Sequence, residues 1–164
     1  MKTEIQGKAW IFGDDINTDI ISPGEYMDAS YEDIGKHAME RAFPGFSEAI
    51  AKGDIIVAGH NFGPGSSRET AQIALKYAGV GGVIAKDFAR IFFRNCINTG
   101  FPVISFADTE KITQGDELKV DLLNGTINNL TTGEIYQGSK LPEHVLSIVA
   151  DGGLKQHLKK KFNK

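Results

Sequence analysis

Short apolar runs alternate with stretches of helical periodicity over residues 54–106, and few folds accommodate this pattern. In chain order we expect a strand at Asp54–Ala58, a helix at Ser67–Ala78, a strand at Val83–Ala85, a helix at Asp87–Asn98 and a strand at Pro102–Phe106. A β-α-β-α-β order predicts parallel strands joined by right-handed crossovers. Ligands of such sheets bind in the loops that follow the carboxyl ends of the strands.

Residues that typically cap or end helices support these boundaries. Gly79 and Gly100 are expected to end the two helices, and Asp87 is expected to cap the start of the second. A glycine-rich loop, Gly59–Gly65, separates the first strand from the first helix. The sequence therefore predicts an α/β fold in which this loop is a candidate ligand site.

The flanking segments lack the alternation. We expect a strand at Lys8–Phe12, an irregular polar segment at Asp14–Asp28, helices at Tyr31–Met39 and Ser47–Lys52, and a closing helix from about Glu143. Turns are expected at residues 115–116, 124–125 and 132–133, and they bracket the apolar run Glu117–Leu123. This spacing predicts a short antiparallel β-meander beside the parallel middle.

The chain has 164 residues, of which 41% are apolar, and this is enough for one hydrophobic core. We therefore expect a single domain over residues 1–164, with residues 155–164 as a basic tail. That tail carries five lysines and no acid, which gives it a charge of +5. Because the whole chain has a net charge of −3, residues 1–154 carry −8. So acidic a body is atypical of a nucleic-acid-binding protein. No membrane-length apolar run and no signal-peptide pattern occur, so a cytoplasmic location without membrane contact is expected.

The residue types that hold metals are few and poorly spaced. A single cysteine, Cys96, cannot by itself hold an iron–sulfur cluster or a thiolate zinc site. The four histidines are His37, His60, His144 and His157, and they have no ligand spacing. Asp15, Asn17 and Asp19 match the first positions of a calcium loop, but the residues at loop positions 6 and 12 do not fit. We expect no metal on this chain.

The segment Gly63–Glu69, GPGSSRE, lies between the first predicted strand and helix. Its glycines allow a close backbone approach to a ligand, and a helix start favours an anion. Arg68 adds a fork of donors suited to a carboxylate or a phosphate. Ser66–Glu69 also fits a capping box, and this purely structural role stays open. The patterns of phosphate-binding loops, dinucleotide sites and hydrolase nucleophile elbows are absent.

Several motifs resemble one family when taken in order. They are Asn17–Pro23 (NTDIISP), Gly59–Glu69 (GHNFGPGSSRE), Ile84–Asn95 (IAKDFARIFFRN) and Gly100–Ile104 (GFPVI). Together they resemble the small subunits of 3-isopropylmalate dehydratases, the separate-chain form of the aconitase swivel domain. The resemblance extends over most of the chain and implies a single swivelling domain with three β/β/α layers.

The resemblance also implies an activity. It implies a hydro-lyase subunit that isomerises 2-isopropylmalate to 3-isopropylmalate by dehydration and rehydration, in leucine biosynthesis. A large partner subunit would carry a [4Fe–4S] cluster, whose open iron acts as a Lewis acid on the dicarboxylate substrate. By motif position, Ser66 would be the catalytic base, and Ser67 and Arg68 would bind a substrate carboxylate. Thr18 and Asp19 would also contribute to the substrate site.

The loop Pro23–Ala29, called the specificity loop below, lies where members of the family vary with substrate. Homoaconitase-type subunits have an arginine for an extra substrate carboxylate where this chain has Asp28. Tyr26 and Met27 offer apolar surface for an alkyl branch. The expected substrate is therefore 2-isopropylmalate, with 2,3-dimethylmalate or a homoaconitase-type substrate as alternatives.

Two positions leave the substrate open, because Thr70 and Gln72 depart from the His and Pro usual in the family. A non-enzymatic alternative also remains, in which the same helix start senses a small anion. That alternative predicts only a modest loss of binding in Ser66→Ala.

Overall fold

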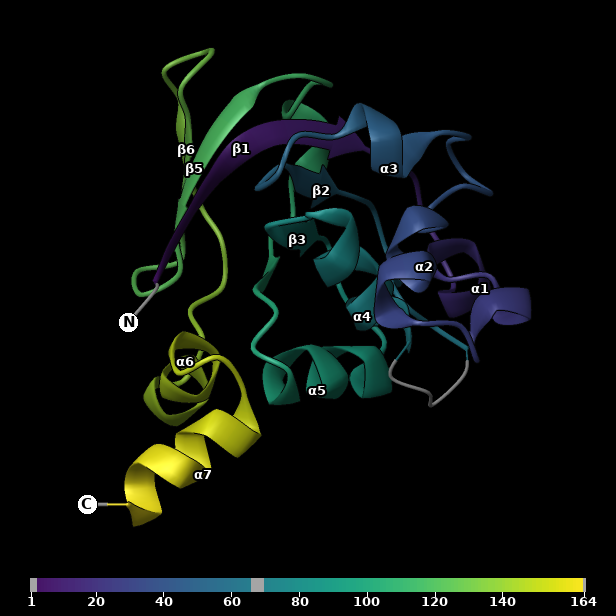
Figure 1. Cartoon of the computed structure of the whole chain (residues 1–164). Coiled ribbons are helices and arrows are strands. Elements are labelled where there is room, and N and C mark those ends of the chain that lie inside the picture. The colour runs from purple at the N-terminus through teal and green to yellow at the C-terminus, as the bar shows by residue number, and fades with distance from the viewer. Residues whose placement is uncertain (1–2, 66–69, 164) are drawn as a thin grey trace.

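The computed structural model describes residues 3–65 and 70–163, and its strands form one curled sheet (Figure 1). The strands are β1 Glu4–Ile11, β2 Ile55–Val57, β3 Gly82–Ala85, β4 Val103–Ser105, β5 Glu117–Asp121, β6 Thr126–Asn129 and β7 Ile135–Gln137. Their order across the sheet is β4-β3-β2-β1-β5-β6-β7. The sheet is thus built outward from β1, which occupies its centre.

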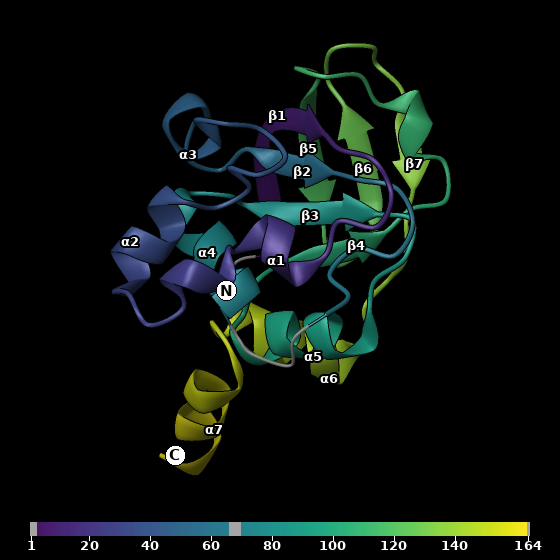
Figure 2. The same ribbon diagram turned by 90° about the vertical axis from the view of Figure 1, so that its right-hand side faces the viewer.

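The sheet has a parallel half and an antiparallel half that meet at β1. Strands β1 to β4 pair in parallel, with Ile56 opposite both Trp10 and Val83. Strands β1, β5, β6 and β7 pair antiparallel. The expected α/β fold, with a parallel β-α-β-α-β middle and an antiparallel portion, is confirmed. Both halves are visible in the rotated view (Figure 2).

Helices surround the parallel half. They are α1 Thr18–Ile21, α2 Tyr31–Lys36, α3 Phe46–Ala49, α4 Thr70–Ala78, α5 Arg90–Asn98, α6 Glu143–Ala150 and α7 Leu154–Phe162, with short 3-10 turns η1 Gly24–Tyr26 and η2 Thr109–Lys111. Because β2, β3 and β4 follow one another across the sheet, right-handed crossovers place α4 and α5 on the same face (Figure 1).

The burial of the strands explains why the elements in the middle of the chain could be predicted from the sequence. Every residue of β2 and β3 is buried, as expected for parallel strands covered on both faces. In β5, by contrast, Leu118 and Val120 are buried while their neighbours are only half-buried. The glycines of the three predicted turns, Gly115, Gly125 and Gly133, have positive φ angles, so the meander is confirmed.

Several predicted boundaries differ from the structure. The polar segment 14–28 contains α1 and η1, and α2 ends at Lys36 rather than at Met39. Met39 has a φ of 58°, which is incompatible with helix continuation. The closing helix is two helices, because Gly152 and Gly153 adopt φ angles of 91° and 126° between them.

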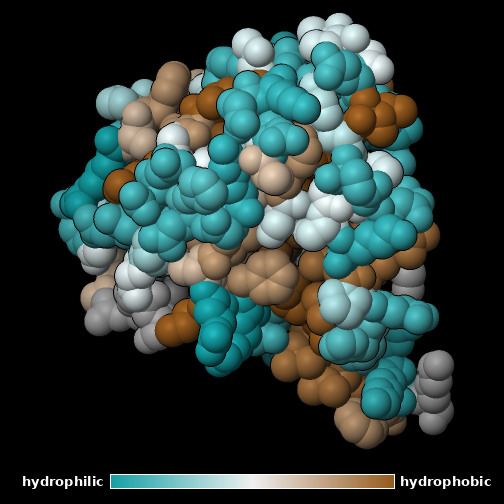
Figure 3. Space-filling model, turned by 180° about the vertical axis from the view of Figure 1, so that it is seen from behind, coloured by the Kyte–Doolittle hydropathy of each residue, from teal (hydrophilic) through white to brown (hydrophobic). Residues whose placement is uncertain are grey.

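The basic tail forms most of α7, which projects from the body next to α6 (Figure 1). Asp151, just before α7, pairs with two basic side chains of this helix. Its carboxylate contacts His157 Nδ1 at 2.8 Å and Lys160 Nζ at 3.2 Å. From behind, the surface in this region is partly hydrophobic (Figure 3), and the α7 side chains Leu158 and Phe162 are exposed. None of the helices described is long and apolar enough to cross a membrane.

Helix α2 packs closely on α4, and this contact positions the segments that follow α2. A Cβ atom on Gly35 would lie 2.8 Å from the backbone of Tyr77, so only glycine fits there. Ile34, Ala38 and Ala74 form a small apolar cluster in the same contact. The segment 37–45 therefore follows a helix that is packed tightly against α4.

Candidate active site

Three loops at the carboxyl edge of the parallel strands lie against one another. They follow β1, β2 and β3, as expected for a ligand site in a sheet of this kind. The loop after β2, Gly59–Gly65, lies between the other two. Lys86 N donates to Gly59 O at 3.0 Å, and Phe62 N donates to Asp87 O at 3.1 Å, so the glycine-rich loop is fixed to the loop after β3.

Backbone hydrogen bonds also join the glycine-rich loop to the loop after β1. Asp15 N donates to His60 O at 2.9 Å, and Gly63 N donates to Ile16 O at 2.8 Å. Thr18 N, at the start of α1, donates to Pro64 O at 2.8 Å. Two of the motifs that define the family resemblance, Asn17–Pro23 and Gly59–Glu69, are thereby brought side by side although 35 residues separate them in sequence.

The glycines of this loop serve packing within the chain. A Cβ atom on Gly63 would lie 2.3 Å from the Phe92 ring, and one on Gly65 would lie 2.5 Å from Thr18 Oγ1. Both glycines have positive φ angles. The groups of the chain that approach these glycines closely are Phe92 and Thr18, and the expected approach of a ligand stays a prediction.

Asp87 has a different role from the predicted one. Helix α5 begins after Ala89, which makes no side-chain cap, so the expected Asp87 cap is wrong. Instead, Asp87 Oδ2 contacts His60 Nδ1 at 2.7 Å, and Oδ1 accepts a hydrogen bond from Asn61 N. The hydrogen bond to His60, followed by that to Asn61 N, lowers the pKa of Asp87. Asp87 therefore fixes the glycine-rich loop.

A cavity of about 250 Å³ opens beside these loops, between Gly13, Asp14 and Gly59 on one side and Lys86 and Glu110 on the other. Lys86 Nζ lies 2.8 Å from Glu110 Oε2. This hydrogen bond raises the pKa of Lys86 and lowers that of Glu110, so both remain charged near neutral pH.

The sequence-predicted site residues fall into two groups. Ser66, Ser67 and Arg68 lie outside the described residues. Thr18 is half-buried at the start of α1 and contacts Gly65, the residue before Ser66. Asp19 follows it on the same helix and is exposed.

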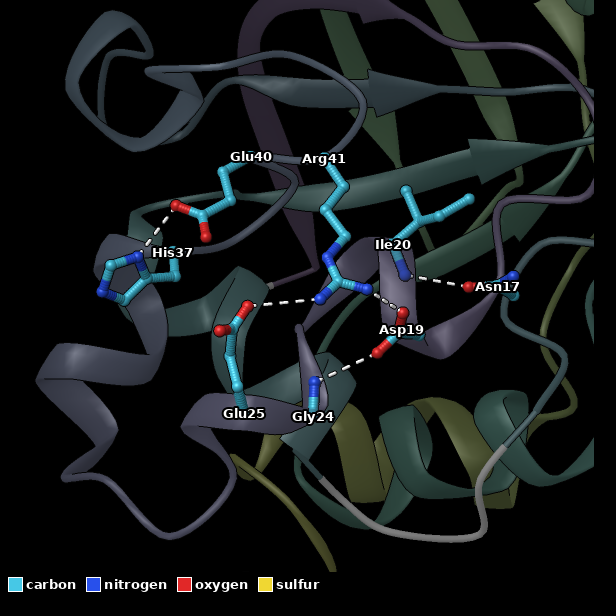
Figure 4. Close-up of polar contacts among 8 residues, drawn as sticks. All are labelled: Asn17, Asp19, Ile20, Gly24, Glu25, His37, Glu40 and Arg41. Carbon is cyan, nitrogen blue, oxygen red and sulfur yellow. Dashed lines mark hydrogen bonds and ion pairs between the residues drawn. The ribbon is translucent and has the colours of Figure 1, made fainter.

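Asp19 is the centre of a charged cluster (Figure 4). Its Oδ2 accepts a hydrogen bond from Arg41 Nη1, and its Oδ1 accepts one from Gly24 N at 3.1 Å. Arg41 Nη2 also donates to Glu25 Oε1 at 3.2 Å. One guanidinium thus bridges α1 and the specificity loop.

The specificity loop carries the half-buried side chains of Tyr26 and Met27 and two exposed acids, Glu25 and Asp28. The Tyr26 ring stacks on the His37 ring with 3.6 Å between centroids, and His37 Nδ1 contacts Glu40 Oε2 at 2.8 Å. Desolvation, reinforced by the charges of Glu25 and Glu40, raises the pKa of Tyr26. Met27 is half-buried and Asp28 is exposed.

Sequence reasoning missed Arg41 and His37. Their partners lie up to 22 residues away along the chain, so no local spacing points to them. The one available signal was the scarcity of arginine, since the chain has only four.

Cys96 and Gln72 are both buried. Burial raises the pKa of the Cys96 thiol well above its usual range, as expected for an inert core cysteine. Among the described residues no three His, Cys, Asp or Glu side chains form a group suited to a metal. Gln72, one of the two departures from the family pattern, is 1% exposed on α4 and lies within its packed face, whereas Thr70 is half-buried.

Comparison with known proteins identifies relatives along the whole chain. The aconitase C-terminal domain family matches residues 15–109. The 3-isopropylmalate dehydratase small subunit 1 of Thermotoga maritima is 49% identical over 158 residues, covering 95% of each chain. The methanogen homoaconitase small subunit of Methanothermobacter thermautotrophicus is 50% identical, covering 96% of this chain and 92% of that one.

A solved structure supports the same assignment. The crystal structure of a 3-isopropylmalate dehydratase from Methanocaldococcus jannaschii superposes with a TM-score of 0.88 at 42% identity, covering 96% of this chain and 95% of that chain. Sequence and fold thus agree over nearly the full length. The chain belongs to the aconitase C-terminal domain family and, within it, to the group of 3-isopropylmalate dehydratase small subunits and their near relatives.

Proposed function

We propose that the chain is the small subunit of a hydro-lyase that interconverts 2-isopropylmalate and 3-isopropylmalate by dehydration and rehydration, a step of leucine biosynthesis. The observation that carries the proposal is the identity of about half the residues to a 3-isopropylmalate dehydratase small subunit over 95% of both chains. The contact between α1 and the glycine-rich loop supports it, because the two motifs expected to share the site adjoin each other.

The proposal gives each site residue a role. Ser66 takes the proton from the substrate carbon next to a carboxylate, and Ser67 and Arg68 bind that carboxylate. A serine hydroxyl is a weak base in water, so its alkoxide needs nearby donors and an environment from which water is excluded. Arg68 and the backbone N–H groups at a helix start supply such donors. Thr18 and Asp19 complete the polar surroundings from α1.

A large partner subunit supplies the remaining half of the site. The [4Fe–4S] cluster is assigned to that partner, because Cys96, the one cysteine of this chain, is fully buried and a cluster needs several thiolates. When bound there, the cluster supplies Lewis acidity toward the substrate hydroxyl and a carboxylate. The cytoplasm, where glutathione keeps thiols reduced, is the proposed location of the complex.

The specificity loop favours a substrate with an alkyl branch. Tyr26 and Met27 present half-buried apolar surface, while the exposed Asp28 repels an additional carboxylate. Arg41 contacts this loop, and its guanidinium already binds Asp19 and Glu25. The homoaconitase-type substrate remains an alternative. A relative named as a homoaconitase small subunit has about the same sequence identity to this chain as a relative named for isopropylmalate.

The test is to reconstitute the chain with its large subunit under anaerobic conditions. We expect a brown heteromeric complex with an iron–sulfur spectrum, and we expect its highest kcat/KM on 2-isopropylmalate. Assays on 2,3-dimethylmalate and homocitrate provide the comparison. Preferential turnover of homocitrate would replace the substrate assignment, and failure to assemble with any large subunit would contradict the proposal, favouring an anion-sensing domain.

A further inference from the structure

We propose that Arg41 is a positioning residue for substrate recognition, which holds the specificity loop in a fixed place against α1. The inference rests on the proposed function, because it assumes that this loop selects the substrate side chain. Arg41 is not part of any motif that marks the family resemblance, and it lies in the turn segment between α2 and α3.

The guanidinium of Arg41 connects two elements that carry site residues (Figure 4). Nη1 donates to Asp19 Oδ2 on α1, and Nη2 donates to Glu25 Oε1 on η1. A planar fork of donors can engage two carboxylates in fixed directions, which a lysine ammonium does less well. Asp19 adds a third link, since its Oδ1 accepts the hydrogen bond of Gly24 N.

The backbone that carries Arg41 is itself well anchored. Met39, two residues earlier, is fully buried, and its backbone N donates to Ile21 O at the end of α1 at 3.0 Å. Met39 O then accepts hydrogen bonds from Ala42 N at 3.0 Å and Phe43 N at 2.8 Å. Arg41 therefore extends from a rigid turn.

The internal contacts of the specificity loop set its shape and leave its location to other groups. Tyr26 N donates to Pro23 O at 3.1 Å and Met27 N donates to Gly24 O at 3.2 Å, both as short-range turn bonds. Beyond Asp19 and Arg41, the stack of Tyr26 on His37 ties the loop to the segment after α2. Without Arg41 the loop would keep the Gly24–Asp19 hydrogen bond and the Tyr26–His37 stack, but Glu25 would lose its link to the turn that carries Arg41.

The expected effect of Arg41 is on substrate binding rather than on global stability. Arg41 and Glu25 are each roughly half exposed, and exposed ion pairs add little to the free energy of unfolding. A ligand that binds only one loop position loses affinity in proportion to the population of that position. Loosening the loop should therefore raise KM and blunt substrate preference, with a smaller effect on kcat.

The experiment compares Arg41→Gln, Arg41→Lys and Glu25→Gln with the wild-type chain. Hydrogen exchange of the amides of residues 24–27 is measured on the full isolated chain, and KM and kcat are measured with the large subunit on 2-isopropylmalate and 2,3-dimethylmalate. In R41Q and E25Q we expect exchange and KM to rise about tenfold, kcat to change less than about threefold, and the preference between the two malates to fall. R41K should lie between R41Q and wild type.

The matched control is Lys36→Gln. Lys36 forms a more exposed ion pair with Asp33 within α2, at 3.3 Å, and this pair includes no residue of the loop. We expect K36Q to match wild type in exchange, KM and preference. If R41Q exchanges like wild type, the positioning role is overturned, whatever the activity. Faster exchange with unchanged KM and preference overturns the role in recognition.

The exchange and kinetic measurements also distinguish a failure of this inference from a failure of the proposed function. A wild-type complex inactive on every malate overturns the proposed function and, with it, the role of Arg41 in recognition. Faster exchange in R41Q would still support the positioning contact in that case, because the exchange measurement needs no activity.

Discussion

The backbone N–H of His60 donates to the Asp14 carboxylate at 2.7 Å, and this bond joins the loops that follow β1 and β2. Gly59, the preceding residue, lies so close to Asp14 that a Cβ atom there would be 1.8 Å from the same carboxylate oxygen. A side chain at position 59 would therefore displace the Asp14 carboxylate from its hydrogen bond with His60 N.

Gly59→Ala should destabilise the chain and separate the two loops. Displacing the Asp14 carboxylate from its charge-assisted hydrogen bond with His60 N costs roughly 1–3 kcal/mol of unfolding free energy. Urea denaturation measures this loss, and the reconstituted complex should lose activity because α1 and the glycine-rich loop shift apart. Gly13→Ala is the matched control, since a Cβ atom there meets nothing within 4 Å and should change stability by less than about 0.5 kcal/mol. Equal stability of the two variants would contradict the close contact.

The pair of Asp87 and His60 predicts a pH-dependent contribution to stability. Hydrogen bonds from His60 and from Asn61 N lower the folded-state pKa of Asp87 below its usual 3.8. The unfolded chain therefore binds more protons near that pH, so the stabilisation is present above about pH 4 and is lost as the pH falls through the folded-state pKa. The stability difference between wild type and Asp87→Asn should be larger at about pH 5 than at about pH 3. Urea denaturation at these pH values tests this, and a difference that persists undiminished at acid pH would contradict it.

Replacing Gln72 with an apolar residue of similar volume is predicted to increase the stability of the chain. Its side chain is 1% exposed, and neither amide atom has a hydrogen-bond partner among the described residues. An unpaired buried polar group is costly, so Gln72→Met, which keeps the volume, should raise the free energy of unfolding by about 1–2 kcal/mol.

The control for Gln72→Met is a buried amide whose hydrogen bonds are made. Asn129 is fully buried, donates to Asp116 Oδ2 at 2.9 Å and accepts from the backbone of Thr131 and Thr132. Asn129→Leu should lose about 2–3 kcal/mol in the same thermal or chemical unfolding experiment. A loss in Gln72→Met would show that its amide is paired.

Where burial sets the structure, the sequence predicted it well. Strands β2 and β4 lie within the predicted apolar runs and β3 begins one residue before its run, because parallel strands covered on both faces need continuous apolar residues. The three glycine turns were found for a local reason too, since positive φ angles favour glycine. Helix ends were less accurate: α2 stops early because Met39 turns away to bond with Ile21 O, a contact 18 residues distant.

The site is less predictable because its contacts are long-range. Asp87 was expected to cap a helix, which is a local role, but its partners His60 and Asn61 lie 27 and 26 residues earlier. Arg41 reaches back to Asp19 and Glu25. Thr18, in contrast, was placed in the site by its motif, and the structure sets it against Gly65.

Ser66→Ala tests the proposed base directly. General bases contribute on the order of 10²–10⁴-fold to a rate, so we expect kcat of the reconstituted complex to fall roughly 10³-fold, about 4 kcal/mol in activation free energy. KM should change little, because Ser67, Arg68 and the partner still hold the substrate. Ser147→Ala is a suitable control, since its hydroxyl donates to His144 O within α6. An anion-sensing domain would instead keep most of its ligand affinity in Ser66→Ala and show no turnover in either form, and retained turnover in Ser66→Ala would transfer the role of base to another group.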